Sequence, residues 1–170
     1  MRLVNMTESE VYLKRKIHEL ESKVMENPKS DAIFDLATLY KDNDNITKAL
    51  EYCVFGLRKI PDSHKGFILL GDIFLTMKNH PKAERAYANA FKLKPSDPEP
   101  LFRMSDIYIE SEDIKKLNTN YQKLESTVPL DKRMPILEDA VHQLRKKTAD
   151  NPLTVHKNIN PAPNRKENVK

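Results

Sequence analysis

The sequence predicts an all-α protein, a solenoid of three helix pairs with a capping helix at each end. Three observations predict this fold. Apolar side chains recur at helical spacing, and the same residue types return every 34 positions between about residues 30 and 131. The chain also contains three glycines and no tryptophan, which disfavours a turn-dense β fold. A period of 34 residues indicates stacked helix–turn–helix units.

The composition indicates one soluble, strongly helical domain. Hydrophobic residues make up 39% and charged residues 32% of the chain, and its 170 residues are enough for one domain with a core. A single cysteine, Cys53, permits no internal disulfide, which is typical of a reducing compartment. No stretch approaches the ~18 consecutive apolar residues that span a bilayer, and the first residues do not form a signal peptide. We therefore expect a cytoplasmic protein without a transmembrane segment.

Residues 1–29 are expected to form an N-terminal capping helix. Thr7, with Glu10 three residues later, makes a capping-box pattern that favours a helix start, and Asn27-Pro28 ends the helix. The apolar stripe of this helix comprises Leu13, Ile17, Leu20 and Val24. Because no partner helix precedes it, the helix is typical of a solenoid cap. The same spacing also permits a short coiled-coil seam with a second molecule.

Three units follow, at residues 30–63, 64–97 and 98–131. They agree in eight columns, each read by adding 34 to a residue number. The columns of the first helix are Ile33, Phe67, Leu101; Leu36, Leu70, Met104; Ala37, Gly71, Ser105; and Tyr40, Phe74, Tyr108. The columns of the second helix are Ala49, Ala83, Leu117; Cys53, Tyr87, Tyr121; and Gly56, Ala90, Leu124, and the closing column is Pro61, Pro95, Pro129. A repeat this regular predicts three copies of one helix hairpin.

Each column has a physical reason. Small residues in the middle of the first helix let the second helix of the same unit approach closely, and the aromatic residue one turn later fills the space between successive pairs. Proline ends the second helix because it lacks an amide hydrogen and clashes with the preceding turn. Residues suited to N-caps recur before the second helix, at Asn45, Asn79 and Asp113, and before the first, at Ser30, Ser63 and Asp97.

In these columns the chain resembles the tetratricopeptide-repeat (TPR) family over about residues 30–131. The resemblance implies a right-handed α-solenoid whose first helices line a concave, ligand-binding face. Leu117 and Leu124 depart from the small residues of the family's pattern. This departure predicts that the helices of the third unit splay or face a different neighbour.

Residues 132–148 are expected to form a C-terminal capping helix, and residues 149–170 a disordered basic tail. The helix has one apolar face but fails the repeat columns, because Glu138 and Asp139 stand where apolar and small residues would fall. Residues 131–170 contain nine basic and five acidic side chains, so the net charge of +4 is concentrated there. Such a tail is typical of a solubilising segment, and it also permits an electrostatic tether to nucleic acid or an anionic membrane. It lacks interleaved aromatic residues, which disfavours specific nucleic-acid binding.

The sequence contains no pattern typical of an enzyme or a metal site. Its five histidines are scattered over different predicted elements, and none forms a short-spaced pair with a second histidine or a cysteine. Surface or capping roles are expected for His64 and His80, and a core position for Cys53, which stands in a packing column. Without a phosphate loop or a nucleophile elbow, we expect neither catalytic activity nor a cofactor.

Function is expected on the concave face that the resemblance implies, at first-helix positions outside the packing columns. The predicted groove residues are Phe34, Asp35, Thr38, Lys65, Ile68, Leu69, Asp72, Leu75, Phe102, Arg103, Asp106 and Ile109. An apolar floor with an acidic rim favours an amphipathic or extended peptide that carries basic residues. Some of the apolar members are alternatively buried against neighbouring helices. The groove lacks the Lys, Asn and Arg set with which clamp-type members of the family grip acidic chaperone C-termini.

The sequence therefore predicts an adaptor or scaffold that holds a protein or peptide ligand, with assembly into a homo-oligomer left open. Three alternatives remain. One is a small secretion-type chaperone, which shares the layout of three repeats between terminal helices. The others are a self-assembling structural protein and a nucleic-acid-associated factor that acts through the basic tail. A salt titration distinguishes the nucleic-acid-associated factor from the others, because the affinity of a basic tail for a polyanion falls sharply between low and moderate salt.

Overall fold

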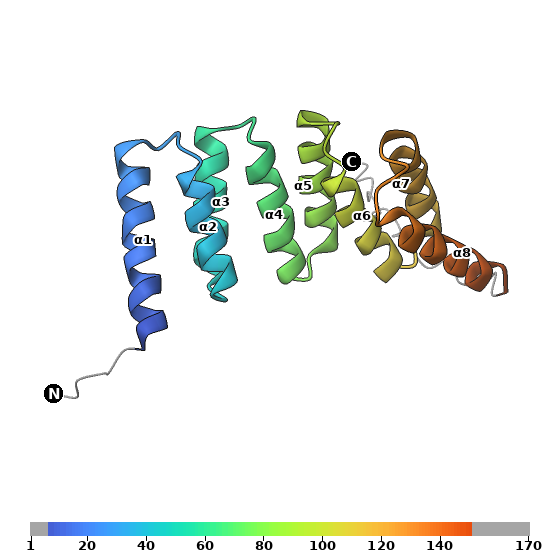
Figure 1. Cartoon of the computed structure of the whole chain (residues 1–170), viewed down its shortest axis with the longest axis horizontal. Coiled ribbons are helices and arrows are strands. Elements are labelled where there is room, and N and C mark those ends of the chain that lie inside the picture. The colour runs from blue at the N-terminus through green and yellow to red at the C-terminus, as the bar shows by residue number, and fades with distance from the viewer. Residues whose placement is uncertain (1–6, 151–170) are drawn as a thin grey trace, which may run out of the picture.

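The structure is a computed structural model in which residues 7–150 are described. Within this range the chain forms eight α-helices and no strand, so the predicted all-α fold is confirmed. The helices are α1 (Glu8–Glu26), α2 (Ala32–Asp42), α3 (Ile46–Lys59), α4 (His64–Thr76), α5 (His80–Leu93), α6 (Glu99–Glu110), α7 (Ile114–Thr127) and α8 (Met134–Asp150). They stand side by side in chain order, each in contact with the next, with α8 lying obliquely at the C-terminal end (Figure 1). Across α1 to α8, no helix combines the length and the apolar character needed to cross a membrane.

α1 begins with the predicted capping box. The Thr7 hydroxyl accepts a hydrogen bond from the Glu10 amide at 3.2 Å, and the Glu10 carboxylate accepts one from the Thr7 amide at 2.7 Å. Leu20 and Val24 are buried in one core cluster with residues of α2 and α3. The C-terminal part of the apolar stripe of α1 therefore packs on the first helix pair of its own chain.

The three turns inside the helix pairs share one geometry. The residue before each N-cap has a positive φ, at Asp44 (58°), Lys78 (54°) and Glu112 (55°). The next residue caps the second helix through its side chain, which confirms the N-caps predicted at Asn45, Asn79 and Asp113. The left-handed conformation was not predicted, because it is unusual for residues other than glycine and none of the three is glycine.

The boundaries between the units differ in part from the predicted caps. Ser63 caps α4, and its hydroxyl accepts a hydrogen bond from the Gly66 amide at 3.0 Å. α2 and α6 begin one residue later than predicted. Ser30 and Asp97 still accept a hydrogen bond from the amide two residues on. These two side chains therefore stabilise the turn that leads into the helix rather than capping the helix itself.

Two glycines mark close approaches between helices. A Cβ atom on Gly71 of α4 would lie 2.4 Å from the ring of Tyr87 in α5, and Tyr87 is fully buried. A Cβ atom on Gly66 would lie 2.5 Å from the ring of Phe34 in α2. Both distances are far below ordinary van der Waals contact, so the missing side chains set the separation of these helices.

The larger side chains of the third pair lie in the core of the C-terminal half. Leu117 and Leu124 are fully buried and belong to one core cluster with four apolar residues of α8. The Asn120 side chain of α7 donates a hydrogen bond to the Leu101 carbonyl of α6 at 3.0 Å, which connects the two helices of the pair. α8 follows this pair and packs against α7, so the third unit has a different neighbour on its C-terminal side from the helix pairs that follow the first two units.

α8 begins two residues later than predicted and includes Ala149 and Asp150, which the sequence analysis assigned to the tail. The first proline after its apolar face is Pro152, and a proline biases the residue immediately before it away from helical backbone. The helix can therefore continue to Asp150. The remainder of the predicted basic tail, residues 151–170, lies outside the described residues, as do residues 1–6.

Candidate functional site

Five of the predicted groove residues border one cleft between α2 and α4. The cleft measures about 340 Å³ and is lined by Thr38, Lys65, Ile68, Leu69 and Asp72, together with Lys41, Asp42 and His64. Leu69 is almost fully buried and Ile68 is half-buried, so the floor is apolar. Charged side chains stand around it. This region is called the α2–α4 cleft below.

Three further predicted residues, Phe102, Arg103 and Asp106, border a second cleft of about 250 Å³ between α6 and α8. Arg133, Ile136 and Leu137 form its other wall, and Ile136 is 74% exposed. The C-terminal helix, for which the sequence suggested only a capping role, thus supplies part of this α6–α8 cleft.

The remaining four predicted residues line neither cleft. Phe34 has no exposed surface, so its assignment to the groove is corrected to a core position, as the alternative interpretation allowed. Asp35 is exposed, and its carboxylate pairs with Lys65 at 2.5 Å. Leu75 is half-buried against the core of the C-terminal half, and Ile109 is exposed.

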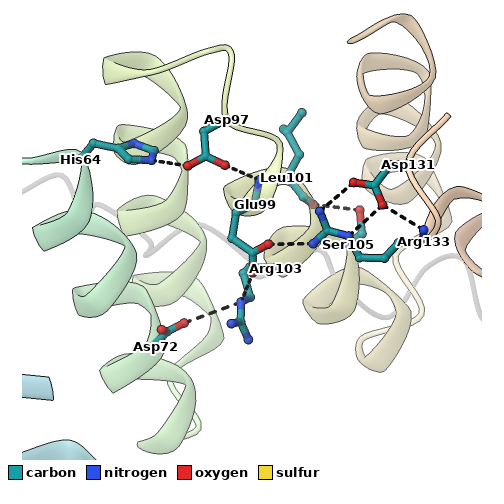
Figure 2. A network of polar contacts seen from close by, with 9 residues as sticks. All are labelled: His64, Asp72, Asp97, Glu99, Leu101, Arg103, Ser105, Asp131 and Arg133. Carbon is teal, nitrogen blue, oxygen red and sulfur yellow. Dashed lines mark hydrogen bonds and ion pairs between the residues drawn. The ribbon is translucent and has the colours of Figure 1, made fainter. Parts of the chain in front are cut away.

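A chain of ion pairs connects α4, α6 and the start of α8 (Figure 2). Arg103 lies 3.9 Å from Asp72 of α4 and 2.9 Å from Glu99 of its own helix. Glu99 also pairs with Arg133 at 2.7 Å, and Arg133 pairs with Asp131 at 2.9 Å. Because the ion pairs share partners, they hold together Asp72, which lines the α2–α4 cleft, and Arg103, Glu99 and Arg133, which line the α6–α8 cleft.

Arg133 is a site residue that the sequence analysis missed. Its guanidinium lies 3.6 Å from the centroid of the Phe102 ring, in addition to its two carboxylate partners. A cation over an aromatic face is stabilised by the ring quadrupole. One feature of the sequence could have identified it. A basic residue beside a helix N-terminus is unfavourable for the helix dipole, which suggests that it has a tertiary partner.

The aspartates at the clefts are partly neutralised by the chain itself. Asp72 accepts a hydrogen bond from the Tyr87 hydroxyl at 2.7 Å in addition to its ion pair with Arg103. Asp106 has an exposed side chain that forms no hydrogen bond or ion pair within residues 7–150, and the partial burial of its carboxyl group raises its pKa above the usual range. The rim therefore mixes opposite charges, whereas the sequence suggested a mainly acidic one.

His64 connects the second helix pair to the linker that follows it. Its Nδ1 lies 2.9 Å from the Ala90 carbonyl oxygen of α5, and its Nε2 lies 2.7 Å from the carboxylate of Asp97 (Figure 2). The imidazole is half-buried, and it also lines the α2–α4 cleft. His64 therefore belongs both to this cleft and to the junction between the second and third pairs.

Side chains that could carry covalent or metal chemistry are buried or dispersed within the described part of the chain. Cys53 is fully buried, and burial raises the pKa of its thiol to about 12. Between residues 7 and 150, no three His, Cys, Asp or Glu side chains gather in a way that could hold a metal ion. Near pH 7 the Cys53 thiol is therefore neutral, and a neutral thiol is a poor nucleophile.

Two proteins are similar to this chain in sequence, while no protein-family model matches it. Protein O-mannosyl-transferase Tmtc3 of Drosophila melanogaster is 28% identical over 123 residues, and human Protein O-mannosyl-transferase TMTC3 is 31% identical over 110 residues. The matches cover 72% and 64% of this chain but 13% and 11% of the two relatives. The chain thus corresponds to a small part of each relative.

Solved structures share the fold at low sequence identity. The crystal structure of MamA has a TM-score of 0.64 at 16% identity and covers 88% of this chain and 94% of its own. The Arabidopsis OM64 TPR domain has a TM-score of 0.57 at 13% identity, with 77% and 98% covered. The TPR2B domain of yeast Sti1, solved in a complex with pHsp70, has a TM-score of 0.54 at 11% identity, with 78% and 98% covered. At these identities the likeness concerns the fold.

Proposed function

Because the chain is a tetratricopeptide-repeat protein in its repeat pattern and its fold, we propose that it is a non-catalytic interaction scaffold that holds a segment of another protein. The proposed ligand lies on the first-helix face, the surface formed by α2, α4 and α6. One observation carries the proposal: residues chosen from sequence alone, Lys65, Ile68 and Asp72 among them, border a single cleft. We expect the ligand to enter the α2–α4 cleft and to extend toward the α6–α8 cleft.

The chemistry of the two clefts supports a peptide that is apolar and carries basic residues. Ile68 and Leu69 offer an apolar floor that suits one ligand side chain. Asp106, which has no ion-pair partner among the described residues, is available to a basic ligand residue. Asp72 is already engaged by the chain, so its role would be to position the ligand rather than to supply net charge.

One of the structurally similar proteins supports a binding role. The TPR2B domain of yeast Sti1 is solved in a complex with pHsp70, which supports a protein ligand for this fold. The two sequence relatives are named as transferases, but the match to this chain covers only 13% and 11% of their lengths. We assign the matched part a binding role. The single cysteine suits a reducing compartment such as the cytoplasm, where we propose that the scaffold acts.

A peptide-display selection on the full chain, followed by calorimetric titration of the enriched peptides, tests this proposal. Ile68→Gln puts an amide on the floor of the α2–α4 cleft and is expected to weaken binding about tenfold or more, the usual effect of losing a central anchor. The matched control is Ile109→Gln, the same change on a first-helix residue outside both clefts. It is expected to change the affinity by no more than about twofold.

A charge variant tests the ligand chemistry separately. Asp106→Lys is expected to weaken the binding of peptides with basic residues about fivefold, since it replaces an unpaired carboxylate by a positive charge that repels them. Melting curves of all variants check that the fold is kept. Equal losses in the two glutamine variants, or full affinity in Ile68→Gln, would reject the α2–α4 cleft. Light scattering over a range of concentrations reports whether the chain also self-associates.

A further inference from the structure

A cavity of about 560 Å³ opens between α5, α6 and α7 and shares no lining residue with either cleft of the first-helix face. Its floor is apolar. Leu101, Met104 and Tyr108 of α6 line it and are each at most 6% exposed, and Phe91 of α5 lines its side. The volume lies within the range of roughly 300–1,000 Å³ that is usual for specific ligand sites. This region is called the α5–α7 cavity below.

The rim of this cavity is basic. Lys92 of α5 and Lys115, Lys116 and Lys123 of α7 line it, with Glu84 as the only lining carboxylate. Glu84 is already paired with Lys116 at 2.9 Å. The side chains of Lys92, Lys115 and Lys123 form no hydrogen bond or ion pair within residues 7–150. Three positive charges therefore surround an apolar floor without compensation by the described chain.

The repeat does not require a lysine at position 115 or 123. Thirty-four positions earlier, Lys115 and Lys123 correspond to Pro81 and Asn89. Lys115 and Lys123 are eight residues apart in α7, which places them about 12 Å apart along the helix axis. A ligand that neutralises both must carry more than one negative charge.

We propose that the α5–α7 cavity binds an acidic segment of a partner protein, with an apolar side chain on the floor and carboxylates facing the lysines. Carboxylates spaced along a peptide match cations about 12 Å apart. A fatty acid presents a single carboxylate, and a nucleic acid has no aliphatic side chain for the floor. The site is separate from the first-helix face, whose proposed ligand carries the opposite charge.

The same display selection provides the test, because it does not presuppose the ligand. We expect a class of enriched peptides in which Asp or Glu flanks Leu, Met or Phe. Lys115→Glu combined with Lys123→Glu is expected to weaken these peptides about tenfold, and more at low salt than at high salt. Ala88→Phe, which fills the cavity without changing its charge, is expected to weaken them by a similar factor.

The matched control is Arg58→Glu, which reverses an exposed charge 34 positions before Lys92. It should leave the affinity within about twofold, because Arg58 lies outside the cavity. Acidic peptides that bind the double lysine variant as tightly as the unchanged chain would overturn the proposal, as would a selection without acidic peptides. Oleate and a single-stranded oligonucleotide serve as competing probes. If either probe loses affinity in the cavity variants while the peptides do not, the cavity belongs to that class of ligand instead.

Discussion

At the scale of single residues, the contact between Gly71 and Tyr87 determines how closely α4 and α5 pack. Gly71→Ala would place a methyl group 2.4 Å from a fully buried ring. Alanine favours a helix over glycine by about 1 kcal/mol, while overpacking a core costs about 1–3 kcal/mol. The gain in helix propensity offsets part of this cost, so we expect a net loss of up to about 2 kcal/mol in the free energy of unfolding, measured by urea denaturation.

A second background separates the clash from other effects of the substitution. Tyr87→Leu removes the ring, at the expense of its hydrogen bond to Asp72. In that background Gly71→Ala is expected to be neutral or stabilising, because only the gain in helix propensity remains. The same loss in both backgrounds would show that the ring does not limit the approach of the two helices.

At the scale of elements, the recurring turn within each pair depends on one residue in the left-handed conformation. Lys78 has a φ of 54°. Lys78→Val is expected to lower the free energy of unfolding by about 1–2 kcal/mol, since a β-branched side chain is strained at positive φ. Lys78→Gly should be neutral or slightly stabilising, because glycine adopts this conformation freely. Chemical denaturation measures both variants.

The corresponding residue of the third pair provides the control for the turn. Glu112 has a φ of 55°, so valine and glycine should have the same order of effects there. A valine variant as stable as the glycine variant at both positions would contradict a turn that requires the left-handed conformation.

Arg133, which contacts the Phe102 ring and two carboxylates, adds to the buried apolar contacts that hold α8. Arg133→Met keeps the aliphatic length but removes the charge. We expect amide hydrogens of α8 to exchange about 5–30 times faster, corresponding to a loss of about 1–2 kcal/mol from the attached state. Exchange in α2 and α3 serves as the internal reference and should not change. Uniformly faster exchange would instead indicate global destabilisation.

At the scale of the whole molecule, the sequence predicts features that depend on residues close together along the chain. It does not predict contacts between side chains that are far apart in the sequence. Asn45, Asn79 and Asp113 were identified as caps because a cap contacts an amide three residues away. The assignment of Phe34 to the groove was wrong, because its burial depends on the space that Gly66 leaves on another helix. The pairs of Asp72 with Tyr87 and of Glu99 with Arg133 join residues 15 and 34 positions apart, and no local pattern specifies them.

The junctions between units also make the whole solenoid sensitive to acid. Hydrogen bonds from Arg133 lower the pKa of Asp131 to about 2. Burial opposes ionisation of Asp97, but the Glu99 amide and His64 outweigh it, and the pKa of Asp97 is lowered as well. A carboxylate with a lowered pKa stabilises the folded chain above its unfolded pKa of about 3.9, and this contribution is lost as the pH falls through the folded value. We expect the melting temperature to fall between about pH 4 and pH 2.

Two asparagine variants test the sign of this dependence. Asp131→Asn should melt below the unchanged chain at pH 7 and together with it near pH 2, so that its melting temperature depends less on pH. Asp106 behaves in the opposite way, because burial raises its pKa and its ionised form therefore destabilises the folded chain at neutral pH. Asp106→Asn should melt above the unchanged chain at pH 7, and the difference should vanish as the pH falls below the unfolded value. If the two variants shift the melting temperature in the same direction at pH 7, one of these electrostatic assignments is wrong.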